Sequence, residues 1–229
     1  MNDFVIAPPA TPSIPVAGTE GRFPVRRIFC VGRNYAEHAR EMGHDPDREP
    51  PFFFTKPADA VLTGDADLPY PPQTEDLHFE AELVVALGKG GRDIPASAAQ
   101  DCVWGYAAGI DFTRRDLQAQ AKKAGRPWDM AKGFDLSAPC GLLHPVSQVG
   151  VLNDGTIRLT VDGDVRQDSD LSQMIWPVAD VIAYLSGLVE LAPGDLIYSG
   201  TPAGVGAVVR GQVIRVEIDG LTPLQTRIA

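Results

Sequence analysis

Short apolar runs bounded by turn-forming residues recur along the chain, and most of them are too short to form a helix. RRIFCVG (26–32) and FFFTK (52–56) have this form and are predicted as buried strands. HFEAELVVALG (78–88) and VWGYAAGID (103–111) predict a second pair, because small and apolar residues in such runs imply burial. Further strands are expected at TIRLTVDG (156–163), DLIYSG (195–200) and VIRVEID (213–219). The apolar pattern therefore predicts a core made mainly of strands.

Three segments carry helical signals instead. A short helix is expected after Asn34, and TRRDLQAQAKKAG (113–125) predicts a longer one that ends at Gly125. MIWPVADVIAYLSGLVEL (174–191) predicts another helix, with Pro177 near its first turn. Because strands outnumber helices and the two do not alternate regularly, the sequence favours a mixed α+β, β-rich fold over a doubly wound sheet.

Residues 1–25 differ from the rest of the chain in their proline content. Pro8, Pro9, Pro12, Pro15 and Pro24 disfavour regular helix and favour an extended arm over the surface or onto a partner subunit. Residues 26–229 contain no linker-like stretch, and their number fits one ordinary domain. We therefore expect a Pro-rich N-terminal arm followed by a single catalytic domain.

The chain is acidic, since 30 Asp and Glu residues against 20 Lys and Arg residues give a formal net charge of -10. This charge disfavours nonspecific binding to nucleic acid or to an anionic membrane. The first residues lack the basic and apolar regions of a signal peptide, and no apolar run approaches the ~18 residues that span a bilayer. We expect a soluble, cytoplasmic protein whose partners are small ligands and other protein chains.

The three cysteines, Cys30, Cys102 and Cys140, are widely spaced and show no CxxC pairing. This spacing argues against a disulfide framework or a zinc ribbon, and it favours buried thiols without a catalytic role.

Three carboxylates fall in the apolar strands. Glu80 and Glu82 are two residues apart, so the period of a strand puts both on one face. An edge strand with a solvated acidic face would explain this pair alone, but Asp111 ends the small apolar run 104–110, where a carboxylate has no local partner. Three buried carboxylates suit Mg²⁺ or Mn²⁺, which keep positions open for the carboxylate and keto oxygens of a 2-oxo acid. The sequence predicts one divalent cation per chain, held by Glu80, Glu82 and Asp111, and a small 2-oxo acid substrate.

Several other polar residues are candidates for the same chemistry. His38 precedes Glu41 by three residues, so the carboxylate can orient the imidazole as a general base, although a solvated helix surface would have the same sequence. Lys132 lies in a mainly apolar stretch, where it can stabilise an enolate or extend into solvent. The glycines around Thr201 permit close approach to a ligand, or they form a plain surface turn.

Six segments, in this order, resemble the fumarylacetoacetate hydrolase family in its short acylpyruvase and fumarylpyruvate hydrolase branch. They are GRNYAEHAREMG (32–43), FFFTKPADAV (52–61), HFEAELVVALGKGGRDI (78–94), GYAAGIDFTRRDLQ (105–118), RPWDMAKGFD (126–135) and PGDLIYSGTPAGVG (193–206). The resemblance implies a rolled, barrel-like mixed β-sheet, a homodimer, and Mg²⁺ or Mn²⁺ at the three carboxylates.

The resemblance also implies roles for individual residues. His38 and Glu41 correspond to a water-activating dyad on a short lid helix, and Lys132 corresponds to an active-site lysine. The substrate-binding candidates are Arg33, Arg115, Gln118 and Thr201.

The implied reaction is hydrolytic cleavage of a carbon–carbon bond in an acylpyruvate, with pyruvate leaving as an enolate. The sequence leaves fumaryl, maleyl, acetyl and other acyl groups open, and the resemblance of FFFTKPADAV (52–61) to the fumarylpyruvate branch favours fumarylpyruvate, from the catabolism of aromatic compounds. A distal carboxylate would bind Arg33, Arg115 or Arg126. The same segments also resemble oxaloacetate decarboxylases and diene-dioate isomerases or decarboxylases. A non-catalytic, metal-stabilised binding module is the alternative from another class, but such a module needs no candidate base beside a candidate cation.

Overall fold

The longest buried runs of the sequence form the centre of a mixed β-sheet in the computed structural model, which describes residues 4–41 and 50–229 except for the side chains of Ala39 and Glu41. Strands β7 (Ala81–Leu87) and β8 (Val103–Ile110) pair antiparallel in the middle of this sheet. The sheet continues through β14 (Asp195–Tyr198), β3 (Arg27–Gly32) and β4 (Phe52–Lys56) beside β7, and through β10 (Ala138–Cys140), β5 (Val61–Thr63) and β11 (His144–Pro145) beside β8. The pairs β14–β3 and β10–β5 are parallel, which makes the sheet mixed.

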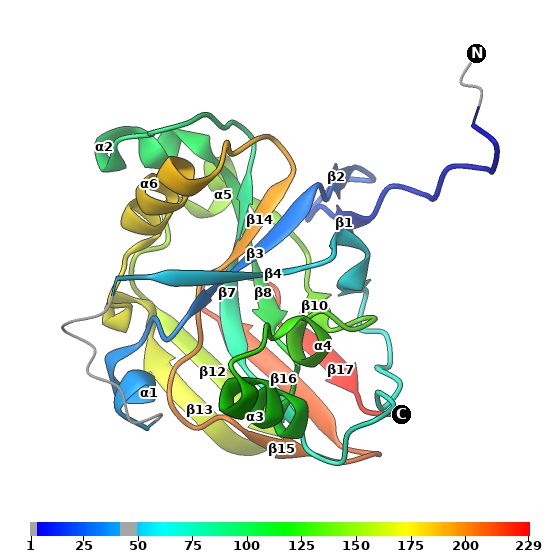
Figure 1. Ribbon diagram of the computed structural model, residues 1–229. Helices are drawn as coiled ribbons and strands as arrows, with labels where there is room; N and C mark the ends of the chain where they lie inside the picture. Colours follow the sequence, from blue (N-terminus) through cyan, green and yellow to red (C-terminus); the bar gives the residue numbers. More distant parts are fainter. Residues whose placement is uncertain (1–3, 42–49) are drawn as a thin grey trace.

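A four-stranded antiparallel sheet covers one face of the large sheet (Figure 1). Its strands, in spatial order, are β13 (Asp164–Asp170), β12 (Thr156–Val161), β16 (Val213–Ile218) and β17 (Leu224–Arg227). Alternate residues of β12, namely Ile157, Leu159 and Val161, are buried in the core between the two sheets. The β12–β13 hairpin turns at Asp162 and Gly163, which have φ values of 52° and 90°, as the Asp-Gly signal predicts.

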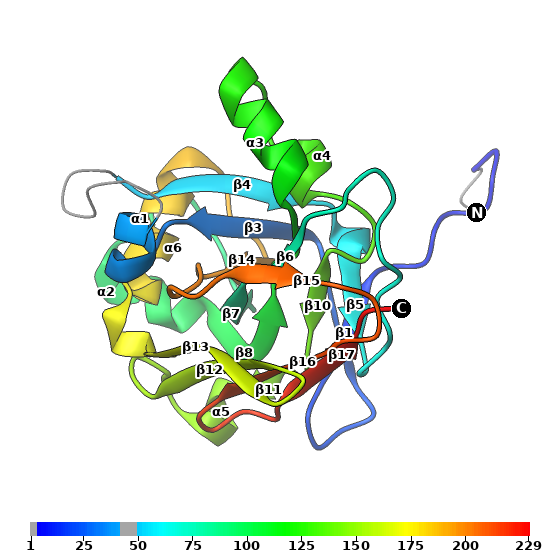
Figure 2. The same cartoon turned by 90° about the horizontal axis from the view of Figure 1, so that it is seen from below.

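Helices cover the edges and ends of the sheets. The α-helices are α1 (Ala36–Glu41), α2 (Ala96–Ala99), α3 (Arg115–Ala124), α4 (Asp129–Lys132), α5 (Val146–Val149) and α6 (Val178–Leu188), and short 3-10 turns occupy Ala58–Ala60, Gln100–Cys102 and Leu171–Gln173. Figure 2 shows α3 standing out beyond β4, with α4 beside it, and α1 near the far end of the same strand. Among the described residues, no helix is long and apolar enough to cross a membrane.

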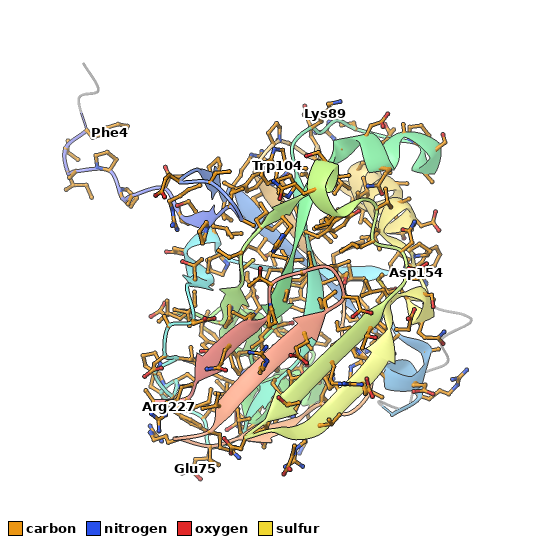
Figure 3. The ribbon with its side chains drawn as sticks, turned by 180° about the vertical axis from the view of Figure 1, so that it is seen from behind. Phe4, Glu75, Lys89, Trp104, Asp154 and Arg227 are labelled. Carbon is orange, nitrogen blue, oxygen red and sulfur yellow. The ribbon has the colours of Figure 1, made fainter. Side chains whose placement is uncertain are left out.

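The second half of the predicted arm closes the other face of the large sheet. Strands β1 (Ser13–Pro15) and β2 (Arg22–Pro24) form a hairpin whose Ile14 and Phe23 are buried against residues of the sheet such as Val84. Phe23 also packs its ring against Trp104, with 5.3 Å between the centroids. Residues before β1 extend away from the body, and Phe4 lies near their outer end (Figure 3). Because both faces of the large sheet are covered, every residue of β7 is buried.

The predicted β-rich α+β fold with a rolled mixed sheet is confirmed. The single strand expected over 78–88 is wrong in one respect, since Glu80 separates β6 (Leu77–Phe79) from β7. β6 pairs with β15 (Gly206–Val208) and β9 (Thr113–Arg114) in a separate small sheet, so the chain changes sheets at Glu80. The three cysteines are buried and unpaired.

Candidate active site

The antiparallel register of β7 and β8 brings the three predicted carboxylates together. Glu82 lies opposite Gly109. Two residues beyond this pair, the Asp111 amide donates a 2.8 Å hydrogen bond to the Glu80 carbonyl. All three side chains are buried, and one carboxylate oxygen from each lies within 4.8 Å of the others. Residues about thirty positions apart in the sequence thus form one acidic cluster at the end of two neighbouring strands.

Two of the three carboxylates have cationic partners. Lys132 Nζ lies 2.7 Å from Glu80 Oε2 and 2.7 Å from Asp111 Oδ2. Arg115 Nη2 lies 2.6 Å from Glu80 Oε1. Glu82 makes no ion pair with any described residue and instead accepts a 2.9 Å hydrogen bond from the amide of Gly200.

The pKa values follow this distribution of charge. Burial, together with the neighbouring Asp111 and Glu80 carboxylates, raises the pKa of Glu82 well above its usual value. Burial alone would also raise the pKa of Glu80, but Lys132 and Arg115 hold it well below its usual range. Burial disfavours the charged form of Lys132, yet the two carboxylates outweigh it and raise the pKa of its ammonium group. Glu82 is therefore the member of the cluster that most lacks positive charge.

A cavity opens directly above the cluster and collects the other predicted residues. Its lining includes Glu80, Glu82, His38, Lys132, Arg33, Arg115, Gln118 and Thr201. Asp111 lies beneath this lining and is fully buried. The side chain of Glu41 is outside the described residues, so its pairing with His38 stays a prediction. The structure brings every other predicted site residue to one place.

Asn34 fixes the entry to α1 and so the position of His38. Its side-chain amide donates to the carbonyls of Trp176 and Ser199 at 2.9 and 2.8 Å, and its carbonyl oxygen accepts from the Trp176 amide at 2.8 Å. Gly200, which binds Glu82, packs against Asn34 with a φ of 95°, and a Cβ there would lie 2.6 Å from the Asn34 Cβ. The close packing of Asn34 and Gly200 therefore links the start of α1 to Glu82 of the cluster.

Two buried polar residues near the site, Lys56 and Gln167, were not among the candidates predicted from the sequence. Lys56 Nζ lies 2.8 Å from Asp111 Oδ1 and donates to the carbonyls of Phe112 and Lys132. Gln167 accepts from the amide of Ala81 at 2.9 Å and donates to Thr201 Oγ1 at 2.8 Å. The apolar run FFFTK offered a signal for Lys56, a lysine that ends a buried strand, whereas Gln167 lies in a polar segment without one.

The whole body of the chain matches one protein family. The model described as "Fumarylacetoacetate (FAA) hydrolase C-terminal" matches residues 27–229. The chain belongs to the fumarylacetoacetate hydrolase family. The predicted family resemblance is thus confirmed, and the residues of the cavity all lie within the matched region.

Individual members of the fumarylacetoacetate hydrolase family are similar to this chain along nearly their full length. Fumarylpyruvate hydrolase from Ralstonia sp is 42% identical over 189 residues, which cover 82% of this chain and 98% of that protein. Mitochondrial oxaloacetate decarboxylase from Dictyostelium discoideum is 43% identical over 197 residues, covering 86% and 90%. The crystal structure of fumarylpyruvate hydrolase from Pseudomonas aeruginosa, in complex with Mn²⁺ and pyruvate, is 55% identical, with a TM-score of 0.98 and 99% coverage of both chains.

Proposed function

We propose that this protein is a metal-dependent hydrolase that cleaves fumarylpyruvate into fumarate and pyruvate. The observation that carries this proposal is the buried cluster of Glu80, Glu82 and Asp111 beneath a cavity whose lining also includes His38 and Lys132. The similarity to a fumarylpyruvate hydrolase solved with Mn²⁺ and pyruvate supports it along the whole chain.

The three carboxylates fit a divalent cation, Mn²⁺ or Mg²⁺. All their donors are oxygens, which these cations prefer, and Glu82 has no ion pair among the described residues. Glu80, Glu82 and Asp111 would hold the ion, which would polarise the oxygens of the 2-oxo acid as a Lewis acid.

The residues around the cavity then supply the proton transfers. His38 takes a proton from water, and the water oxygen bonds to the carbonyl carbon of the fumaryl group. The bond between this carbon and the pyruvate methylene breaks, and the methylene carbon keeps the electron pair and then takes a proton. Lys132, buried beside Glu80 and Asp111, adds positive charge where the departing pyruvate becomes an anion.

Oxaloacetate decarboxylation is the second candidate, because the Dictyostelium discoideum relative carries that activity in its name. Both reactions pass through an anion of pyruvate, so the carboxylate cluster serves either. A base that activates water is needed only for hydrolysis, and His38 in the cavity wall favours hydrolysis for that reason.

The test supplies fumarylpyruvate, acetylpyruvate and oxaloacetate separately to Mn²⁺-loaded protein and follows both the loss of enol absorbance and the formation of pyruvate. We expect turnover of fumarylpyruvate. His38→Ala should still bind Mn²⁺ but lose hydrolysis. Rapid turnover of oxaloacetate with inert acylpyruvates would instead identify a decarboxylase.

We also propose that two copies form a homodimer. Phe4, Val5 and Ile6 are exposed on the arm that extends from the body, and a second copy would cover them. Analytical ultracentrifugation of the full chain tests this proposal. The cytoplasmic location and the role in aromatic-compound catabolism stay predictions.

A further inference from the structure

One wall of the cavity is aromatic. Phe52 and Phe54 are two residues apart on β4 and line the cavity, whereas Phe53 points to the other side and stacks on Tyr184. Trp128, just before α4, meets the Phe52 ring edge-on with 5.6 Å between centroids and lies 6.0 Å from Phe54. Flat rings of this kind suit a flat, conjugated group lying against them.

A cationic side chain lies over each of these three rings. The Arg33 guanidinium lies 5.0 Å from the Phe52 centroid, Lys122 Nζ lies 5.0 Å from the Trp128 centroid, and Lys132 Nζ lies 4.9 Å from Phe54. Lys132 is already paired with two carboxylates of the cluster. Lys122, near the end of α3, makes no ion pair with any carboxylate that the structure describes, and sequence reasoning did not select it.

The surroundings of Lys122 are electropositive. Much of the Lys122 side chain is exposed, yet desolvation of its ammonium group, followed by the charges of Arg115 and Arg33, lowers the pKa of that group. An anion bound between these cations would offset their mutual repulsion. Arg33 and Lys122 thus form a positively charged part of the cavity lining, apart from the carboxylate cluster.

We propose that Lys122, together with Arg33, binds the distal carboxylate of the acyl group and selects dianionic acylpyruvates over those with an uncharged acyl group. The inference rests on the proposed function, because it assumes that the 2-oxo acid end of the substrate lies at Glu80, Glu82 and Asp111. The conjugated acyl chain then lies along Phe52 and Trp128 and ends between the two cations.

The cavity lining decides between the three distal-carboxylate candidates from the sequence. Arg115 is engaged with Glu80 and, at 2.7 Å, with Gln118 Oε1. Arg126 lines a neighbouring cavity of about 430 Å³ that shares Phe52, Phe54, Trp128 and Lys132 with the cavity above the carboxylates, but Arg126 does not line the latter. Arg33 and Lys122 both line the cavity above the carboxylates, and each lies over a ring of its aromatic wall.

The first experiment compares kinetics on two substrates. Lys122→Met keeps an apolar chain against Trp128 but removes the charge. Lys123→Met is the matched control, because Lys123 is also exposed but does not line the cavity. We expect Lys122→Met to raise KM for fumarylpyruvate about tenfold, as loss of one charge-assisted contact does, with little change for acetylpyruvate. Lys122→Arg should recover the preference, and Lys123→Met should leave both substrates unaffected. Equal losses on both substrates, or no loss on either, would overturn the proposal.

The second experiment measures binding without turnover. Tryptophan fluorescence of Mn²⁺-loaded protein is titrated with 2-oxoheptanedioate and with 2-oxoheptanoate, which differ only in the distal carboxylate. The wild-type protein should bind the diacid about tenfold more tightly, and Lys122→Met should remove this preference. Failure of the proposed hydrolysis, with the preference intact, would overturn the function but not the subsite. A wild-type protein without the preference would overturn the subsite whatever the enzyme cleaves.

Discussion

Replacing Lys56 with methionine tests whether a buried lysine supports the acidic cluster. The side chains of Lys56 and Asp111 are both 0% exposed, and 2.8 Å separates Lys56 Nζ from Asp111 Oδ1. The same ammonium group donates to the carbonyls of Phe112, at 3.1 Å, and of Lys132. Methionine has a similar length and volume, so Lys56→Met removes the charge and its hydrogen bonds with little loss of packing.

The expected cost follows from what remains around Asp111. Removing one partner of a buried ion pair costs about 3–5 kcal/mol, because the other charge stays buried. Asp111 keeps Lys132 at 2.7 Å on its second oxygen, so the lower end of this range applies. We expect the free energy of unfolding to fall by about 3 kcal/mol, which lowers Tm by about 6–12 °C in a protein of this size.

The assay is urea unfolding in the presence of chelator, so that metal binding does not contribute. Lys123→Met is the control for the same substitution on the surface and should change the free energy of unfolding by less than about 0.5 kcal/mol. Asp111→Asn and the double variant complete a mutant cycle, in which the two losses should not add. Additive losses, or a Lys56→Met cost no larger than the control, would show that Lys56 does not hold Asp111.

Three further substitutions test the rest of the site. Because burial and nearby carboxylates raise the folded-state pKa of Glu82, the metal-free protein should lose stability as pH rises from the unfolded value of about 4.3 toward the folded one. Glu82→Gln should flatten this dependence and raise the metal-free Tm at pH 8, while abolishing the Tm increase on adding Mn²⁺; an unchanged pH slope would contradict the assignment. Gly200→Ala places a Cβ 2.6 Å from the Asn34 Cβ, at a residue whose φ is 95°. It should lower the free energy of unfolding by about 1–3 kcal/mol and weaken Mn²⁺ binding, measured by calorimetry. Arg115→Lys loses the planar guanidinium that binds Glu80 and Gln118 at the same time, so kcat/KM should fall about 10–100-fold at unchanged Tm; wild-type kcat/KM would rule out this role.

The fold class and the acidic cluster were predictable because both depend on local patterns. Short apolar runs predicted strands, and the spacing of Glu80 and Glu82 predicted one face. That Asp111 joins them depends on which strands are neighbours and on the register that sets Glu82 opposite Gly109. The lone carboxylate at the end of a small apolar run suggested that Asp111 joins them, and the family resemblance supported this, but the register itself was not predictable.

Residues whose role depends on long-range packing could not be predicted in the same way. Lys122 looks like any lysine on the charged surface of a helix, and only the turn between α3 and α4 places it over Trp128. Gln167 reaches Thr201 from a strand of the second sheet. The break at Glu80 arises because β6 pairs with strands far along the chain, and a continuous apolar pattern does not reveal this change of partners.

The charges at the site explain how so acidic a chain can bind an anionic substrate. The carboxylates of Glu80, Glu82 and Asp111 contribute three negative charges, and the side chains of Lys56, Lys132 and Arg115 contribute three positive ones. These charges sum to zero when all are ionised, so a divalent cation would leave a local charge of two at the cluster, and Lys122 and Arg33 add positive charge in the same cavity. The formal net charge of -10 acts over longer distances, where salt screens it beyond about 8–10 Å. The few charged groups that line the cavity therefore attract an anionic substrate, and the proposed selectivity for a dianion comes from Lys122 and Arg33 at the far end of the cavity from the cluster.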